Sequence, residues 1–214
     1  LHAGREKSLY RHHPWIFSGA VGRVDGHPKS GETVDIISTK GEFLAKAAYS
    51  PDSNIRARAW GWLDTPIDAD FLRTKLDAAI SRRRGGSETH PYNSYRLVHA
   101  ESDGIPGLIV DRYGDDLLVM QVLTAGAEYW RDTLADLLVE LTGIPNIYER
   151  SDVDVRTLEG LAPRAGVLRG TLPESVILEE HGIKFNVDVV NGHKTGFYLD
   201  QRENRHLVGQ LAEG

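Results

Sequence analysis

The stretch TVDIISTKGEFLAKAAYSPDSNIRARAW, Thr33–Trp60, decides the fold of the first part of the chain. Apolar and polar residues alternate in three short runs: 33–37, 42–45 and 55–60. A period of two is typical of half-buried β-strands, and Gly41 and the Ser50-Pro51-Asp52 turn separate the runs. We therefore expect a small β-barrel domain over residues 1–66.

The charge of the chain is unevenly distributed. Residues 1–62 hold nine Lys and Arg against six Asp and Glu, a net charge of 9 − 6 = +3, whereas the whole chain has a net charge of −6. A basic module on an acidic protein is typical of proteins that bind polyanions. Arg56 and Arg58 share one face of the last predicted strand. They form either a solvated polar face or contacts to RNA phosphates.

Residues 67–175 predict an α+β central domain. Apolar residues recur at spacings of three and four between Ile67 and Ile80, which indicates a helix. The later elements are expected to be an antiparallel meander of strands over 96–100, 108–112 and 117–123, a helix over 128–141 and a strand over 146–149. This part of the sequence indicates no chemistry by itself.

Several classes of site are excluded or disfavoured by composition. No apolar run approaches the roughly 18 to 20 residues of a membrane-spanning helix, and the N-terminus lacks the apolar core of a signal peptide, so we expect a cytoplasmic protein with no membrane partner. The absence of cysteine excludes disulfides and a cysteine nucleophile within these residues. Asp152 and Asp154 alternate but lack a third acid, so no metal is expected. A homodimer is left open.

Residues 176–214 predict a β-hairpin connector. Strands over 176–180 and 183–189 flank the tight turn His181-Gly182. The outgoing strand leads into NGHKTGFYLDQRENR, Asn191–Arg205. The glycines around Lys194 and Thr195 would let the backbone approach a ligand closely, and an ordinary surface loop is the alternative.

Six short motifs spread along the chain resemble those of a known protein family. They are GREKSL (4–9), HPWIFSG (13–19), AYSP (48–51), ESDGIPG (101–107), EEHG (179–182) and KTGFYLDQR (194–202). In this order they resemble the bacterial large-subunit (23S) rRNA cytosine-C5 methyltransferase family. The resemblance implies an N-terminal RNA-binding PUA domain, a central α+β domain, a hairpin, and a Rossmann-like domain that binds S-adenosylmethionine. We expect the last domain to be missing from this chain, because no glycine-rich cofactor turn occurs in it.

The resemblance also implies two sets of site residues. The RNA-binding set is Arg5, Lys7, His13, Trp15, Arg56 and Arg58. The set near the cofactor or substrate is Lys194, Thr195, Gly196, Phe197, Tyr198, Asp200, Gln201, Arg202 and Arg205. Phe197 or Tyr198 could stack on a base or adenine, with the amide and the arginines on polar or phosphate groups. Alternatively, Asp200 and Arg202 fasten the hairpin.

The expected function is the RNA-binding and substrate-positioning half of an S-adenosylmethionine-dependent rRNA (cytosine-C5) methyltransferase, with ribosomal RNA as partner. Cytosine C5 becomes nucleophilic when a thiolate adds to C6, and this chain has no cysteine. We therefore expect these residues alone neither to methylate RNA nor to bind S-adenosylmethionine. The alternatives are a stand-alone PUA-type RNA-binding adaptor without catalysis and a metal-dependent nuclease that uses Asp152 and Asp154.

Overall fold

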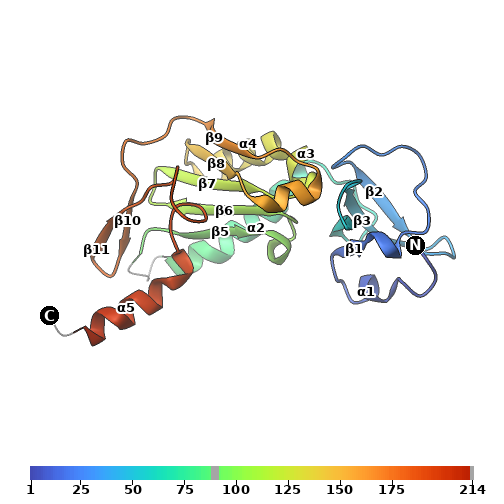
Figure 1. The fold of residues 1–214 in the computed structure, drawn as a ribbon, viewed down its shortest axis with the longest axis horizontal. Helices are drawn as coiled ribbons and strands as arrows, with labels where there is room; N and C mark the ends of the chain where they lie inside the picture. Colours follow the sequence, from blue (N-terminus) through green and yellow to red (C-terminus); the bar gives the residue numbers. More distant parts are fainter. Residues whose placement is uncertain (88–91, 213–214) are drawn as a thin grey trace.

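The computed structural model describes residues 1–87 and 92–212 (Figure 1). The N-terminal part contains α1 (Lys7–Tyr10), β1 (Trp15–Phe17), η1 (Ser18–Ala20), β2 (Thr33–Ile37), β3 (Phe43–Tyr49) and β4 (Ile55–Gly61). The rest contains α2 (Ala69–Ser87), β5 (Tyr95–His99), η2 (Ala100–Asp103), β6 (Leu108–Tyr113), β7 (Leu117–Val122), α3 (Ala125–Tyr129), α4 (Arg131–Thr142), β8 (Ile147–Ser151), η3 (Asp154–Glu159), β9 (Arg164–Arg169), β10 (Ile177–Glu180), β11 (Ile183–Asn186), η4 (Leu199–Gln201) and α5 (Arg202–Leu211).

The N-terminal sheet has the strand order β1-β4-β3-β2, and its paired strands are antiparallel. Its strands β2, β3 and β4 lie where the alternating sequence runs predicted them. The core of this sheet includes several alanines, such as Ala45, Ala47 and Ala57, which let neighbouring elements approach closely. In the edge strand β1, Ile16 is buried while its two neighbours are exposed. Pleating therefore turns Trp15 and Phe17 to the same outer face.

The second sheet has the order β5-β6-β7-β8-β9 and is mixed. β7 and β8 are parallel, and the other pairs are antiparallel. The chain between β7 and β8 forms α3 and α4, so these elements make a β-α-β crossover, the unit from which Rossmann-like sheets are built. The expected antiparallel meander is confirmed for β5, β6 and β7. The predicted α+β fold class is wrong, because β8 pairs with β7 in parallel. Parallel neighbours need a long crossover connection, here through α3 and α4, and cannot be joined by a short turn.

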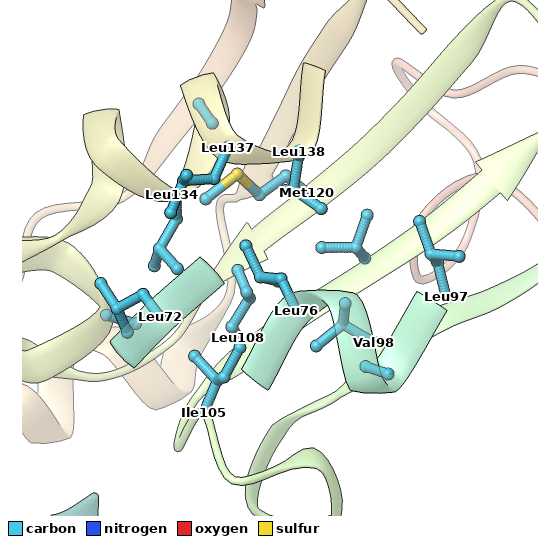
Figure 2. Close-up of a cluster of buried hydrophobic side chains, with 14 of the residues drawn as sticks. Leu72, Leu76, Leu97, Val98, Ile105, Leu108, Met120, Leu134, Leu137 and Leu138 are labelled. Carbon is cyan, nitrogen blue, oxygen red and sulfur yellow. The ribbon is translucent and has the colours of Figure 1, made fainter. Parts of the chain in front are cut away.

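Helices cover one face of the mixed sheet (Figures 1 and 2). Leu72 and Leu76 of α2 meet Leu134 and Leu138 of α4 over Met120 of β7 (Figure 2). These side chains are fully buried. The spacing of four residues places each helical pair on one face of its helix, which is why the apolar pattern predicted both helices.

The hairpin β10–β11 and the segment after it cover part of the other face. Tyr113, Leu117 and Val119 form a second cluster there with Leu178 of β10 and Val187. Every residue of β7 is buried because both faces of this strand are covered. Among the described residues, no helix combines the length and the apolar character needed to cross a bilayer.

The two sheets contact each other through tightly packed groups. A Cβ atom on Gly126 of α3 would lie 2.4 Å from the Cβ of Ala48 and 2.8 Å from the ring of Trp60. A Cβ on Gly31 would lie 2.4 Å from the carbonyl oxygen of Ala125. These contacts leave no room for a side chain at either glycine. The N-terminal sheet is therefore held in a fixed position against the mixed sheet.

Candidate nucleic-acid interface

The exposed basic residues of the N-terminal part lie beside β1. Leu9 of α1 is buried in the core and fixes this short helix, while Arg5 and Lys7 remain exposed. Both line a cavity of about 440 Å³ together with Trp15. The structure thus brings three residues of the predicted RNA-binding set to one surface.

His13 and Trp15 are fixed by hydrogen bonds. The backbone N–H of Trp15 donates to Nδ1 of His13 at 3.2 Å. The indole Nε1–H of Trp15 donates to Oε1 of Glu101 in η2 at 2.8 Å. The rings of His13 and Trp15 meet edge to face, with centroids 5.7 Å apart. Trp15 therefore belongs to the exposed surface and also connects the N-terminal sheet to the central part of the chain.

The two arginines of β4 lie elsewhere. Arg58 is buried, and its Nη1 donates to Oε1 of Glu159 at 2.7 Å. Arg56 is half-buried and donates to the carbonyl of Pro51. The expectation of a shared exposed face is therefore wrong for Arg58. A charge at this position becomes buried because the central part of the chain packs over it and supplies a carboxylate.

Glu159 is the centre of this buried contact. Its Oε2 also accepts from the hydroxyl of Ser50 at 2.8 Å and from the backbone N–H of Ala125 at 3.2 Å. Glu159 lies at the end of η3, and its side chain is 1% exposed. A carboxylate at this depth is stabilised by full pairing with donors. No periodic pattern predicts this residue, because its partners lie more than thirty residues away in the chain.

The segment 191–205 lies at the other end of the molecule, beside β10, β11 and α5 (Figure 1). Thr195 is fully buried, and its hydroxyl donates to Oδ2 of Asp111 at 2.6 Å. Nε and Nη2 of Arg96 donate to the same carboxylate at 2.8 and 3.0 Å, which raises the pKa of Arg96. Burial raises the pKa of Tyr113, whose hydroxyl lies 3.1 Å from Oγ1 of Thr195. Thr195 therefore anchors the loop to β6.

Arg202 and Arg205 are held by Glu180 of β10. Arg205 makes a two-pronged pair with this carboxylate at 2.9 and 2.7 Å, and Nε of Arg202 lies 3.5 Å from it. The guanidinium of Arg202 also stacks on the ring of Tyr92 at 3.4 Å, and that of Arg205 lies 4.5 Å from the ring of Phe197. Arg202 and Arg205 therefore fasten α5 to the hairpin, whereas Asp200, the other residue of the predicted fastening pair, contacts Lys194 instead.

The remaining residues of this segment differ in accessibility. Lys194 and Asp200 are exposed and pair at 3.0 Å, and the hydrogen bonds from Lys194 hold the pKa of Asp200 below its ordinary value. Tyr198 and Gln201 are also exposed. Gly196 has φ +127°, and a Cβ there would lie 3.0 Å from Val187 and Val189. Its lack of a side chain thus serves packing inside the protein.

The predicted metal alternative finds no support in the geometry. Asp152 pairs with Arg150 at 3.0 Å, and Asp154 begins η3. In the portion of the chain that the structure describes, no three His, Asp or Glu side chains converge as metal ligands would. The structure therefore presents one exposed basic and aromatic surface at β1 and one largely self-paired cluster at α5, at opposite ends (Figure 1).

The protein thus consists of an N-terminal sheet with exposed basic and aromatic residues beside its edge strand, packed against a mixed sheet that contains a β-α-β unit. Residues 1–62 match the family model described as a PUA-like domain. The chain is 53% identical over 203 residues to ribosomal RNA large subunit methyltransferase I of Vibrio cholerae, covering 94% of this chain and 51% of the relative. It is 53% identical over 207 residues to the protein of the same name from Aliivibrio fischeri, covering 96% and 52%. The predicted resemblance to large-subunit rRNA methyltransferases is confirmed.

Two solved structures share the fold. One is described as a SAM-dependent methyltransferase from Streptococcus mutans, with a TM-score of 0.79, 21% identity, and coverage of 97% of this chain and 52% of that one. The other is a methyltransferase complexed with SAH, with a TM-score of 0.78, 21% identity, and coverage of 94% and 50%. The predicted fold class, an α+β fold with the Rossmann-like methyltransferase domain missing, is wrong, because these methyltransferase structures cover 97% and 94% of this chain. The chain spans about half the length of the curated relatives that it matches.

Proposed function

We propose that this protein acts in the S-adenosylmethionine-dependent methylation of large-subunit ribosomal RNA. The observation that carries the proposal is the 53% identity over 203 residues to an rRNA large subunit methyltransferase. The PUA-like match over residues 1–62 and the exposed cations Arg5 and Lys7 support a role in binding the RNA. We assign RNA contacts to these two residues and to His13 and Trp15.

S-adenosylmethionine, as methyl donor, supplies the electrophilic methyl group in this class of reaction. The segment 191–205 does not fit it as a binding cradle. Gly192 packs against backbone atoms and Gly196 against Val187 and Val189, and the arginines of the segment already pair with Glu180. Glu180 is thereby engaged and does not offer a free carboxylate for ribose hydroxyls, the group that nucleotide sites commonly use. We therefore assign no cofactor contact to this loop.

The exposed members of the segment suit a role near the RNA. Lys194 and Tyr198 are adjacent, with the ammonium group 4.5 Å from the ring centroid, and Gln201 is exposed on the following turn. We propose these three as substrate-proximal residues. Methylation at cytosine C5 is the finer proposal, and it requires a thiolate that adds to C6. None of the 214 residues is a cysteine, and the test below identifies the methylated atom directly.

The test is transfer of labelled methyl groups from S-adenosylmethionine to 23S rRNA lacking the modification. The whole gene product and this 214-residue chain would be assayed side by side, and nuclease digestion with mass spectrometry would identify the methylated atom. Methylation by the whole gene product at a single cytosine C5 supports the proposal. RNA binding without methylation by either protein would instead favour the RNA-binding adaptor, and methylation at another atom would reject the C5 assignment.

A further inference from the structure

A groove runs beside β1, the edge strand of the N-terminal sheet. Its lining includes the aromatic residues Trp15 and Phe17 and the cations Arg5 and Lys7. Its volume is about 440 Å³. This lies at the lower end of the roughly 300 to 1,000 Å³ of ligand sites, so the groove suits a group about the size of a nucleotide.

The side chain of Phe17 does not contribute to the core of the N-terminal sheet. Of the three residues of β1, Ile16 is the one that belongs to the core cluster, while the side chain of Phe17 is 50% exposed. Its ring meets that of Trp15 edge to face, with centroids 6.3 Å apart. A single exposed apolar residue is ordinary, but two adjoining rings in a groove beside cations form a surface suited to binding.

The aromatic row, formed by His13, Trp15 and Phe17, is held in position by contacts within the protein. His13, Trp15 and Phe17 alternate along the chain, and the hydrogen bonds of Trp15 to His13 and Glu101 fix the middle ring. Glu101 belongs to the central part of the chain, so both parts of the protein set the position of this ring. A rigid surface binds with a smaller loss of conformational entropy than a mobile one.

The charge around the groove identifies the kind of ligand. Arg5 and Lys7 are the charged side chains among the residues that line it, which gives this lining a net charge of +2. Rings beside cations match an unpaired nucleotide, whose base stacks on the ring while its phosphates meet the cations. A base inside a duplex is already stacked on its neighbours and presents no free face.

We propose that Phe17, together with Trp15, is a stacking platform for one unpaired base of RNA, and that Arg5 and Lys7 contact the flanking phosphates. This inference rests on the proposed function. It adds to that function a residue, Phe17, and a requirement that the RNA be single-stranded at this point. The sequence motif around β1 contained this ring, but its exposure became visible only in the fold.

The test is fluorescence anisotropy with a labelled single-stranded RNA over a series of salt concentrations. Phe17→Ala weakens binding about 5- to 150-fold, the range for loss of one base stack, and leaves the salt dependence unchanged. Phe17→Tyr retains an aromatic face and binds nearly as the unmodified chain does. The double variant Arg5→Ala, Lys7→Ala instead flattens the slope of log K against log salt by about 1.4, at about 0.7 per phosphate. Val167→Ala, an apolar residue of β9 that is also 50% exposed, is the matched control.

The outcomes separate the two proposals. RNA binding that Phe17→Ala leaves unaltered overturns the stacking platform and leaves the proposed function standing. Absence of RNA binding by the unmodified chain, even at low salt, counts against both. A duplex that binds as tightly as the single strand and is weakened as much by Phe17→Ala overturns the requirement for an unpaired base. Circular dichroism melting curves establish that each variant is folded.

Discussion

Removal of the Glu159 carboxylate is expected to destabilise the contact between the two sheets. In Glu159→Ala, buried Arg58 loses its carboxylate partner at 2.7 Å and keeps the more distant Glu101 at 3.7 Å. Ser50 and the N–H of Ala125 also lose their acceptor. Breaking one side of a buried ion pair costs about 3 to 5 kcal/mol. For a chain of this size, about 1 kcal/mol shifts Tm by roughly 2 to 4 °C, so Tm should fall by about 6 to 20 °C.

Urea denaturation followed by circular dichroism and tryptophan fluorescence would measure this loss. Glu174→Ala removes an exposed glutamate and is the matched control, expected to change stability by less than about 0.5 kcal/mol. The double variant Arg58→Met, Glu159→Leu should recover much of the loss, because an apolar pair leaves no buried charge. A Glu159→Ala chain as stable as the Glu174→Ala control would refute the view that this ion pair holds the sheets together.

Three further variants test other parts of the fold. Thr195→Ala removes a donor from buried Asp111 and should cost about 1 to 3 kcal/mol in urea titrations, with Thr195→Ser restoring most of it. Burial alone would raise the pKa of Asp103, but hydrogen bonds from Arg83 and a backbone N–H leave that pKa lowered. The unfolded chain therefore binds the proton more readily than the folded chain. The stability that this group contributes is present above the unfolded pKa of about 3.9 and is lost as the pH falls toward the folded pKa. In acid titrations, Asp103→Asn should weaken the dependence of the free energy of unfolding on pH. Gly31→Ala, at φ +84° and against a backbone carbonyl of α3, should lower Tm by several degrees, and an unchanged Tm would contradict the tight contact.

Local patterns predicted the elements that local interactions determine. The strands at 33–37 and 55–61 and the helix faces of Leu72 and Leu76 follow from periods of two and of three to four. The hairpin at 177–186 follows from a two-residue turn. The parallel pairing of β7 with β8 could not be predicted in this way, because it depends on a crossover through two helices.

The candidate site shows the same division. Arg5, Lys7 and Trp15, which the resemblance implied, lie on one surface. Arg58, which the strand pattern placed on one face with Arg56, is instead buried against Glu159 by packing of the second sheet. Alternation along a strand predicts which side chains share a face, whereas it cannot predict whether another part of the chain covers that face. Sequence reasoning missed Glu159 and Glu101 for this reason.

The buried ion pair of Arg58 and the exposed aromatic row belong to the same pair of strands, β1 and β4. Trp15 lies opposite Arg58 in the register of β1 and β4, and both side chains lie near Glu101, at 2.8 Å from Nε1 of Trp15 and 3.7 Å from Nε of Arg58. The contact that joins the sheets therefore also orients the ring that borders the proposed RNA groove. Glu101→Gln retains an oxygen acceptor and should keep both the fold and the position of the ring, whereas Glu101→Ala removes the acceptor and should weaken RNA binding through a less fixed Trp15. A change in RNA affinity of less than about twofold, measured with the same single-stranded RNA, would show that the ring is oriented by its own sheet alone.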